Sequence, residues 1–308
     1  MERFKNILFA SIGGKDDLAA VARANRLAIT NQARLTLVRV IEELPIAASY
    51  FLSKKRLAEF KETSQHLAQK ELDKLSQKID PSLKVETKVL FGKPFIELIR
   101  MAVGHSHDLI IKPKHLTFKE GRLESVDLHL LRKSPCPVLI IKPNQRKPFG
   151  KILIAVDPDP SDTERFKLHQ DLIKLGMSLA KRENSKLEVV HTWELDGESM
   201  LRGPRFKMSE EEIKALTEEV EKTHLKWMED ILSPYDSNNV KTTMAKGPSG
   251  ATLVELIEKK KPDIVVMGTV ARSNLPGLLI GNTAELVVSR ITCSLLAIKP
   301  PGFKTPVS

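Results

Sequence analysis

The sequence has few cysteines, few aromatic residues and no long apolar segment, and each shortage excludes a class of protein. Two cysteines in 308 residues exclude a disulfide scaffold and lead us to expect a reducing cytoplasm. The apolar stretches, such as 138–141, are far shorter than the roughly 20 residues that cross a bilayer. The first residues also lack the features of a secretory signal. We therefore expect a cytoplasmic protein without a membrane span.

Aromatic residues make up 5% of the chain, and no segment has the aromatic-rich pattern on which single-stranded nucleic acids stack. The net charge of +10 would suit nucleic acid, but the lysines and arginines are dispersed among acidic residues, as in 70–74. Such a distribution favours solubility and weak nonspecific attraction. Nucleic acid is therefore not expected as a partner.

The sequence contains an internal repeat. Five segments of the first half return in the second half in the same order, which coincidence would not produce. Small changes in their spacing mark loops and helix turns of different length. The recurring pairs are 6–10 with 151–155, 34–39 with 186–191, 97–99 with 255–257, 108–111 with 263–266, and 136–143 with 293–300.

Each copy alternates apolar runs with helical patterns, which is typical of a parallel sheet covered by helices on both faces. In the second copy, Ser209 before three glutamates predicts a helix N-terminus. The polar, proline-bounded segment 143–148 is the expected linker, so we divide the chain into domains 1–146 and 147–308. For the first copy we predict strands at 7–11, 35–40, 85–90, 109–111 and 138–141, and helices at 17–30, 53–79, 94–103 and 127–133.

The segment after the apolar run 264–267 has the pattern of a phosphate-binding turn. Gly268 follows the run, and Gly281 opens an expected helix. Glycine lets backbone amides approach phosphate oxygens, and a helix N-terminus adds partial positive charge. This predicts a site for a nucleotide or a similar phosphorylated ligand in the second half. A tight turn without a ligand is the alternative interpretation.

These residues resemble the universal stress protein family, whose members carry a strand ending in aspartate and a G-x2-G-x9-G-[ST] loop before the last helix. Here Asp157 ends the run 152–157, and 268–283 reads G-x2-A-x9-G-N-T. The two copies joined head to tail resemble the tandem-domain type of this family. The resemblance implies two flavodoxin-like (adenine nucleotide α hydrolase-like) doubly wound domains with parallel five-stranded sheets. It also implies a cytoplasmic stress-response role and, in some members, ATP binding without strong catalytic activity.

The resemblance also implies where a nucleotide would lie. ATP with Mg²⁺ is the ligand it suggests, with no catalytic residue and no protein metal ligand. We add Arg272 as a cation within the loop that could meet a phosphate. The loop departs from the family pattern in two places, with Ala271 at the middle glycine and asparagine where serine or threonine is usual. Asp157 and Thr192 are expected toward the nucleoside, and Gly268, Thr269, Gly281, Asn282 and Thr283 toward the phosphates.

The first half is expected to bind no nucleotide. Ile12 stands where the second half has Asp157. Pro113 aligns with the first loop glycine and lacks an amide proton. Glu124 aligns with Gly281 and places a negative charge where a phosphate would lie.

Three functional hypotheses stay open. The first is a non-enzymatic, ligand-responsive stress protein. The second is a slow ATPase or phosphotransferase that depends on Asp157, since the sequence has no Walker lysine and no evident general base beside the loop. The third is a carrier of a hydrophobic or lipid-like metabolite, whose cleft the segments 194–208 and 53–79 would line.

The apolar last strands, 138–141 and 295–298, are expected to lie at sheet edges. We expect them to pair with each other within one chain, or in a homodimer.

Two smaller patterns are interpreted structurally. His105-Ser106-His107-Asp108 has no second cluster with metal-ligand spacing, so we expect a solvated loop. Cys136 and Cys293 hold the same position of the repeat. We expect them to be small buried residues and not redox sensors.

Overall fold

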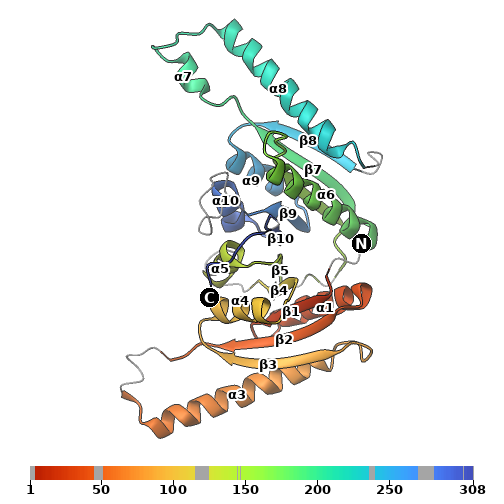
Figure 1. The fold of residues 1–308 in the computed structure, drawn as a ribbon, viewed down its shortest axis with the longest axis vertical. Helices are drawn as coiled ribbons and strands as arrows, with labels where there is room; N and C mark the ends of the chain where they lie inside the picture. The colour runs from red at the N-terminus through yellow and green to blue at the C-terminus, as the bar shows by residue number, and fades with distance from the viewer. Residues whose placement is uncertain are drawn as a thin grey trace. The chain divides into compact units, whose positions relative to one another are not determined.

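The computed structural model describes residues 4–44, 51–114, 125–143, 145, 147–235, 240–269, 281–300 and 302–307. They form two compact units (Figure 1). Unit 1 comprises 1–148, 269–280 and 292–308, and unit 2 comprises 149–268 and 281–291. The last strand of the second repeat thus belongs to unit 1.

The sheet of unit 1 contains the five strands predicted for the first half, each within two residues of its expected ends. They are parallel and lie in the order β3-β2-β1-β4-β5. Beside β5 lies β10 (Ser294–Ile298), which runs antiparallel with Leu296 opposite Leu139. The two last strands of the repeats therefore pair with each other. The strands are β1 (Asn6–Ser11), β2 (Arg34–Ile41), β3 (Val85–Phe91), β4 (Leu109–Pro113) and β5 (Val138–Ile141).

Helices cover both faces of this sheet, as the apolar runs predict. Helices α1 and α3 contact each other, as do α4 and α5. The Ser53 side chain accepts a hydrogen bond from the Arg56 amide and caps α3, and Pro94 lies in the first turn of α4, where its missing amide proton costs nothing. Strands β1 and β4 are buried along their full length. The helices are α1 (Asp16–Asn31), α3 (Lys54–Ser76), α4 (Pro94–Gly104) and α5 (Ser125–Lys133).

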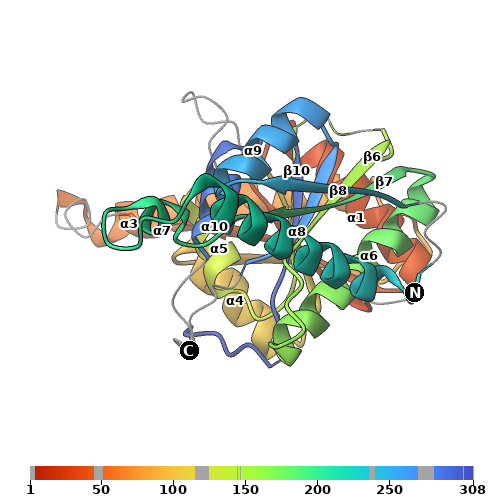
Figure 2. The ribbon, with the colours of Figure 1, turned by 90° about the horizontal axis from the view of Figure 1, so that it is seen from above.

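Unit 2 repeats the arrangement with its own parallel strands in the order β9-β6-β7-β8. In Figure 2, α6 and α8 lie on one side of β7 and β8, and α9 lies on the other. Ser209 and Glu212 form a capping box at the start of α8, which confirms the predicted helix start. The strands are β6 (Lys151–Val156), β7 (Lys186–Trp193), β8 (Val240–Lys246) and β9 (Ile264–Gly268). The helices are α6 (Thr163–Glu183), α7 (Glu198–Arg202), α8 (Glu210–Leu232), α9 (Ser249–Lys260) and α10 (Asn282–Arg290).

The two repeats share one strand register, which fixes the equivalent positions residue by residue. Asp108 accepts hydrogen bonds from the amides of residues 5 and 6, and Asp263 accepts them from residues 150 and 151. These carboxylates tie the start of the first strand of each repeat to the start of its fourth strand. The laterally paired sets are Ile7, Leu35 and Leu109 in unit 1, and Ile152, Leu187 and Ile264 in unit 2.

Both cysteines are buried, as the sequence predicts. Burial raises the pKa of the Cys136 thiol to about 11, which keeps it protonated and unreactive near neutral pH. In the part of the chain that the structure describes, no helix combines the length and the apolar character needed to cross a membrane.

Candidate functional site

Three of the residues predicted from the sequence lie at the carboxyl ends of neighbouring strands in unit 2. Asp157 directly follows β6, Thr192 is near the end of β7, and Gly268 ends β9. Strand β6 lies between β7 and β9, so the strand order reverses beside it. Open α/β sheets bind ligands in the crevice at such a reversal. The register that brings these ends together pairs Val156 with His191 and Ala155 with Met267.

The remaining described residues of the loop motif begin helix α10. Gly281 is its N-cap, and Asn282 and Thr283 start the first turn. Gly281 has no side chain of its own to cap this end, and the first-turn amides of a helix suit the oxygens of an anion. A Cβ on Gly250 of α9 would come within 3.0 Å of Leu286 and 3.5 Å of the Thr283 Cα. The missing side chain therefore lets α9 pack closely against the start of α10.

Asp157 is held by a side chain that the sequence analysis missed. Arg165 of α6 forms an ion pair with its carboxylate and lies 3.9 Å from the Asp159 carboxylate. The Asp157 amide also donates to the His169 Nδ1, at 3.4 Å. Arg165 and His169 are four residues apart and share one face of the helix. That spacing, in a helix that follows a strand ending in aspartate, is the signal that could have found them.

A second group missed from the sequence links β7 to α8. The His191 Nδ1 lies 3.1 Å from the Val156 carbonyl oxygen, and its Nε2 lies 2.8 Å from the His224 Nδ1. The His224 ring stacks against Trp193 at 5.9 Å between centroids and meets the edge of Trp227 at 4.7 Å. His191 and His224 are 33 residues apart in the sequence, so no local pattern predicts that they meet. They anchor α8 beside the strand end that precedes Asp157.

His169 makes the stability of unit 2 depend on pH. Burial, followed by the charges of Arg165 and His191, lowers its pKa to about 3, whereas histidine in an unfolded chain titrates near 6.5. Because the folded pKa is the lower one, this contribution to stability is complete above pH 6.5 and is lost as the pH falls toward 3. We expect His169 alone to lower the free energy of unfolding by about 1 kcal/mol between pH 6.5 and 5.5.

Urea denaturation at both pH values measures this change. His169→Leu has no imidazole to titrate and should show a smaller loss than the unaltered protein, whatever its stability at pH 7. Equal losses of the free energy of unfolding in the two proteins would show that His169 is not the group responsible.

Two other predicted residues, Thr269 and Arg272, have no described side chain at this site. The Thr269 amide donates to the Ile298 carbonyl oxygen and its hydroxyl to that of Leu131, each at 3.2 Å. Thr269 is buried, and both of its donors are thus engaged within unit 1. Arg272 and Ala271 lie outside the described residues, so the role assigned to Arg272 stays a prediction.

In unit 1, the place equivalent to the candidate site contains a buried ion pair. The Lys112 Nζ lies 2.9 Å from the Asp127 Oδ1, and the two side chains are 3% and 0% exposed. Their equivalents in unit 2 are Met267 and Ala284. A carboxylate therefore occupies the first turn of α5, where α10 has a methyl group. This supports the expectation that the first half binds no nucleotide, which stays a prediction because Glu124 lies outside the described residues.

The loop after β1 in unit 1 is likewise closed by its own side chain. Asp17 is buried and accepts hydrogen bonds from the Ser11 hydroxyl at 2.6 Å and from the amides of Ile12 and Gly13 at 2.9 Å each. These amides follow the strand that corresponds to β6. These two backbone amides of unit 1 therefore have a hydrogen-bond acceptor within the protein itself.

The fold and the repeated strand order together define a tandem, doubly wound α/β protein. The model of the universal stress protein family matches residues 3–142 and 148–299, and the chain belongs to that family. It is 30% identical over 237 residues to universal stress protein E of Escherichia coli K12, covering 74% of this chain and 72% of that protein. Over 317 residues it is 26% identical to universal stress protein E of Photorhabdus laumondii, covering 100% and 98%.

Solved structures share the tandem fold along nearly the whole chain. A functionally unknown protein from Pseudomonas aeruginosa PAO1 matches with a TM-score of 0.69 at 24% identity, covering 97% of this chain and 94% of that chain. A universal stress protein from Archaeoglobus fulgidus matches with a TM-score of 0.61 at 17% identity, covering 96% and 98%. At these identities the likeness concerns the fold alone.

Proposed function

We propose that this chain is a non-enzymatic, ligand-responsive stress protein that binds ATP or a related phosphorylated ligand in unit 2. The observation that carries the proposal is the start of α10, where the N-cap is Gly281, a residue with no side chain to cover the first-turn amides. Asp157 lies at the same edge of the sheet, at the reversal of strand order. One edge thus offers donors for phosphates and an acceptor for a nucleoside.

The chemistry of these groups fits the two ends of a nucleotide. The first-turn amides of α10 and the helix dipole favour an anion. The Asp157 side chain is 35% exposed despite its ion pair with Arg165, and a carboxylate accepts hydrogen bonds from ribose hydroxyls or the adenine amino group. Among the described residues, no group of three acidic, histidine or cysteine side chains could hold a metal ion. Mg²⁺ would therefore arrive with the phosphates.

The same residues argue against turnover. A general base works best when its pKa lies near the operating pH. His169 has its pKa lowered to about 3 by burial, and the Asp157 carboxylate is paired with Arg165. Neither is suited to activate water at neutral pH, which favours a binding protein over an ATPase or phosphotransferase.

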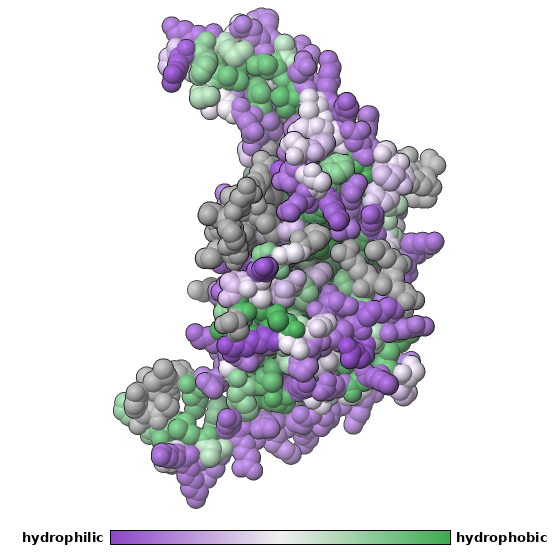
Figure 3. Space-filling model, viewed as in Figure 1, coloured by the Kyte–Doolittle hydropathy of each residue, from purple (hydrophilic) through white to green (hydrophobic). Residues whose placement is uncertain are grey.

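One observation favours the hydrophobic-carrier hypothesis as a second candidate. Figure 3 shows hydrophobic residues gathered over α7 and the start of α8. Met200 is 58% exposed and Phe206 49%, and both lie within the segment 194–208. Apolar side chains of this size gathered on one surface suit a hydrophobic ligand.

Calorimetric titration with ATP and with ADP, in the presence of Mg²⁺, tests the nucleotide proposal. We expect saturable heat from the unaltered chain and at least a tenfold loss of affinity in Asp157→Ala, which removes an acceptor worth about 1.4 kcal/mol or more. Asp159→Asn is the matched control in the same loop. The asparagine oxygen can still accept the hydrogen bonds from the Ser161 amide and hydroxyl. The change removes the charge that lies 3.9 Å from Arg165, and the variant should bind normally.

The two other hypotheses give different results. Sustained phosphate release that Asp157→Ala abolishes would show an enzyme. An absence of heat with either nucleotide, together with a lipid-like mass retained in native mass spectrometry, would favour the carrier.

A further inference from the structure

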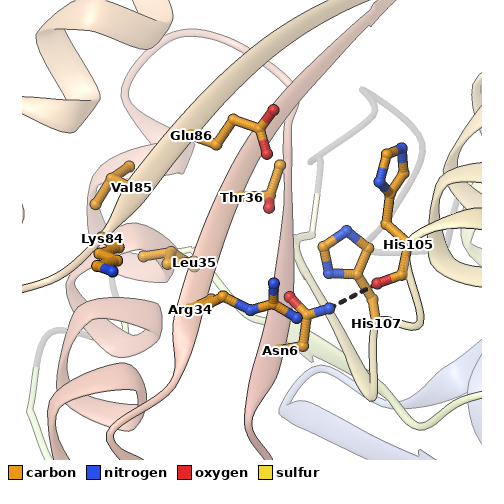
Figure 4. A pocket seen from close by; sticks show the side chains of 9 residues that line it. All are labelled: Asn6, Arg34, Leu35, Thr36, Lys84, Val85, Glu86, His105 and His107. Carbon is orange, nitrogen blue, oxygen red and sulfur yellow. Dashed lines mark hydrogen bonds between the residues drawn. The ribbon is translucent and has the colours of Figure 1, made fainter.

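A pocket lies at the opposite, amino edge of the sheet in unit 1 and plays no part in the candidate nucleotide site. Its volume is about 380 Å³, at the small end of ligand pockets. It forms where β1, β2 and β3 begin, and the loop before β4 closes one side (Figure 4). Every residue that lines it belongs to unit 1.

The lining of the pocket includes a buried histidine whose ring nitrogens have no hydrogen-bond partner among the described residues. The sequence predicts a solvated loop here, but His107 is 6% exposed. In the described part of the chain, neither of its ring nitrogens has a hydrogen-bond partner. Burial, first among several causes, lowers the pKa of His107, so its ring is neutral and offers one donor and one acceptor. A buried polar group in this state is explained by an unseen water or ligand.

The rim of the pocket carries positive charge. Arg34 and Lys84 are both exposed, and the described residues include no ion-pair partner for either. Glu86 also lines the pocket, but its carboxylate lies 3.0 Å from the Lys88 Nζ, which offsets its charge. Figure 4 shows the guanidinium group of Arg34 extending from β2 toward Asn6 and His107.

The equivalent place in unit 2 is filled by side chains of the protein itself. By the shared register, Thr36 corresponds to Glu188 and His105 to Lys260. The Lys260 Nζ lies 2.7 Å from the Glu188 Oε1, which also accepts a hydrogen bond of 2.5 Å from the Thr243 hydroxyl. The fold alone therefore does not require an open pocket here. The opening in unit 1 follows from its own side chains.

We propose that this pocket binds a small phosphate monoester, with the phosphate held by Arg34 and Lys84 and the adjoining hydroxyl or ester oxygen by His107. Arginine and lysine are the usual partners of phosphate, and a neutral imidazole suits the polar part next to it. A divalent cation fits poorly, because two positive side chains would repel it. In addition, no group of three acidic, histidine or cysteine side chains among the described residues is placed to hold a metal ion.

Titration of the full chain with glycerol 3-phosphate, followed by NMR of ¹⁵N-labelled histidine side chains, tests the proposal. We expect the His107 ring signals to shift with saturation, and Arg34→Gln to weaken the affinity about tenfold or more. Arg34 is exposed, so this change should leave the fold intact. The double variant Thr36→Glu/His105→Lys copies the Glu188–Lys260 ion pair and should abolish the shift.

Matched controls separate this pocket from the nucleotide site. Lys186→Gln alters the residue of unit 2 that corresponds to Arg34 and should leave the affinity unchanged. Inorganic phosphate as a second probe shows whether free phosphate suffices or the ester is required, and saturable shifts of His107 by either support the pocket. Full affinity in both pocket variants would overturn the inference. If only Gly281→Glu removes the binding, the phosphate ester binds at the nucleotide site and not in this pocket, and the nucleotide proposal stands. If the His107 signals shift with saturation only when Zn²⁺ is added, the pocket binds a metal ion and not a phosphate ester.

Discussion

Gly281→Glu is expected to lower the affinity for ATP by a hundredfold or more. The change places a carboxylate at the N-cap of α10, beside the amides proposed to face the phosphates, and a like charge there costs about 3 kcal/mol. Gly281 has φ −60°, which any residue adopts, so the backbone is not strained. A negative charge at a helix N-terminus also stabilises the helix. The loss should therefore concern binding and not folding, and calorimetric titration measures it.

Gly281→Gln is the matched control, because it has nearly the same shape without the charge. It should lose much less affinity than the glutamate variant. Ala271→Gly restores the middle glycine of the family pattern and should keep or improve the affinity. An unaltered affinity in Gly281→Glu would move the site elsewhere.

Asp127→Ala is expected to destabilise the protein by about 3–5 kcal/mol, because it leaves the buried Lys112 ammonium without its carboxylate. Both side chains are almost fully buried, so water cannot readily replace the missing partner. The free energy of unfolding from urea denaturation gives the loss directly.

The second repeat supplies the control for this prediction. The double variant Lys112→Met/Asp127→Ala introduces the residues found at Met267 and Ala284, and it should recover most of the lost stability because apolar replacement of a buried pair is often neutral. If the double variant were as unstable as Asp127→Ala alone, the ion pair would not be the cause.

The architecture could be predicted from the sequence because its signals are local and repeated. Strands buried on both faces, such as β1 and β4, contain apolar runs, Ile7 to Ala10 and Leu109 to Ile111. The start of α8 was visible in Ser209 and the glutamates that follow it. The strand-end position of Asp157 followed from the family pattern.

The partners of the site residues could not be predicted, since charge patterns do not say which groups meet. Arg165 meets Asp157 only after α6 folds back over β6, and Lys112 of β4 meets Asp127 of α5. His107 was expected in a solvated loop, because no second cluster has metal-ligand spacing. Its amide instead donates to the Ala102 carbonyl oxygen, and Asp108 ties the loop to β1, which draws the ring inward.

The antiparallel pairing of β5 with β10 means that the first repeat does not complete its own sheet. Residues 1–146 alone would end with the backbone donors and acceptors of β5 unmatched on one side, an edge that recruits another strand. In the full chain the missing strand is tethered, so it is present at an effective concentration on the order of millimolar whatever the protein's abundance. Dilution therefore cannot separate the two last strands. The same contact between independent single-repeat chains would instead form or dissociate as the concentration of those chains rises or falls.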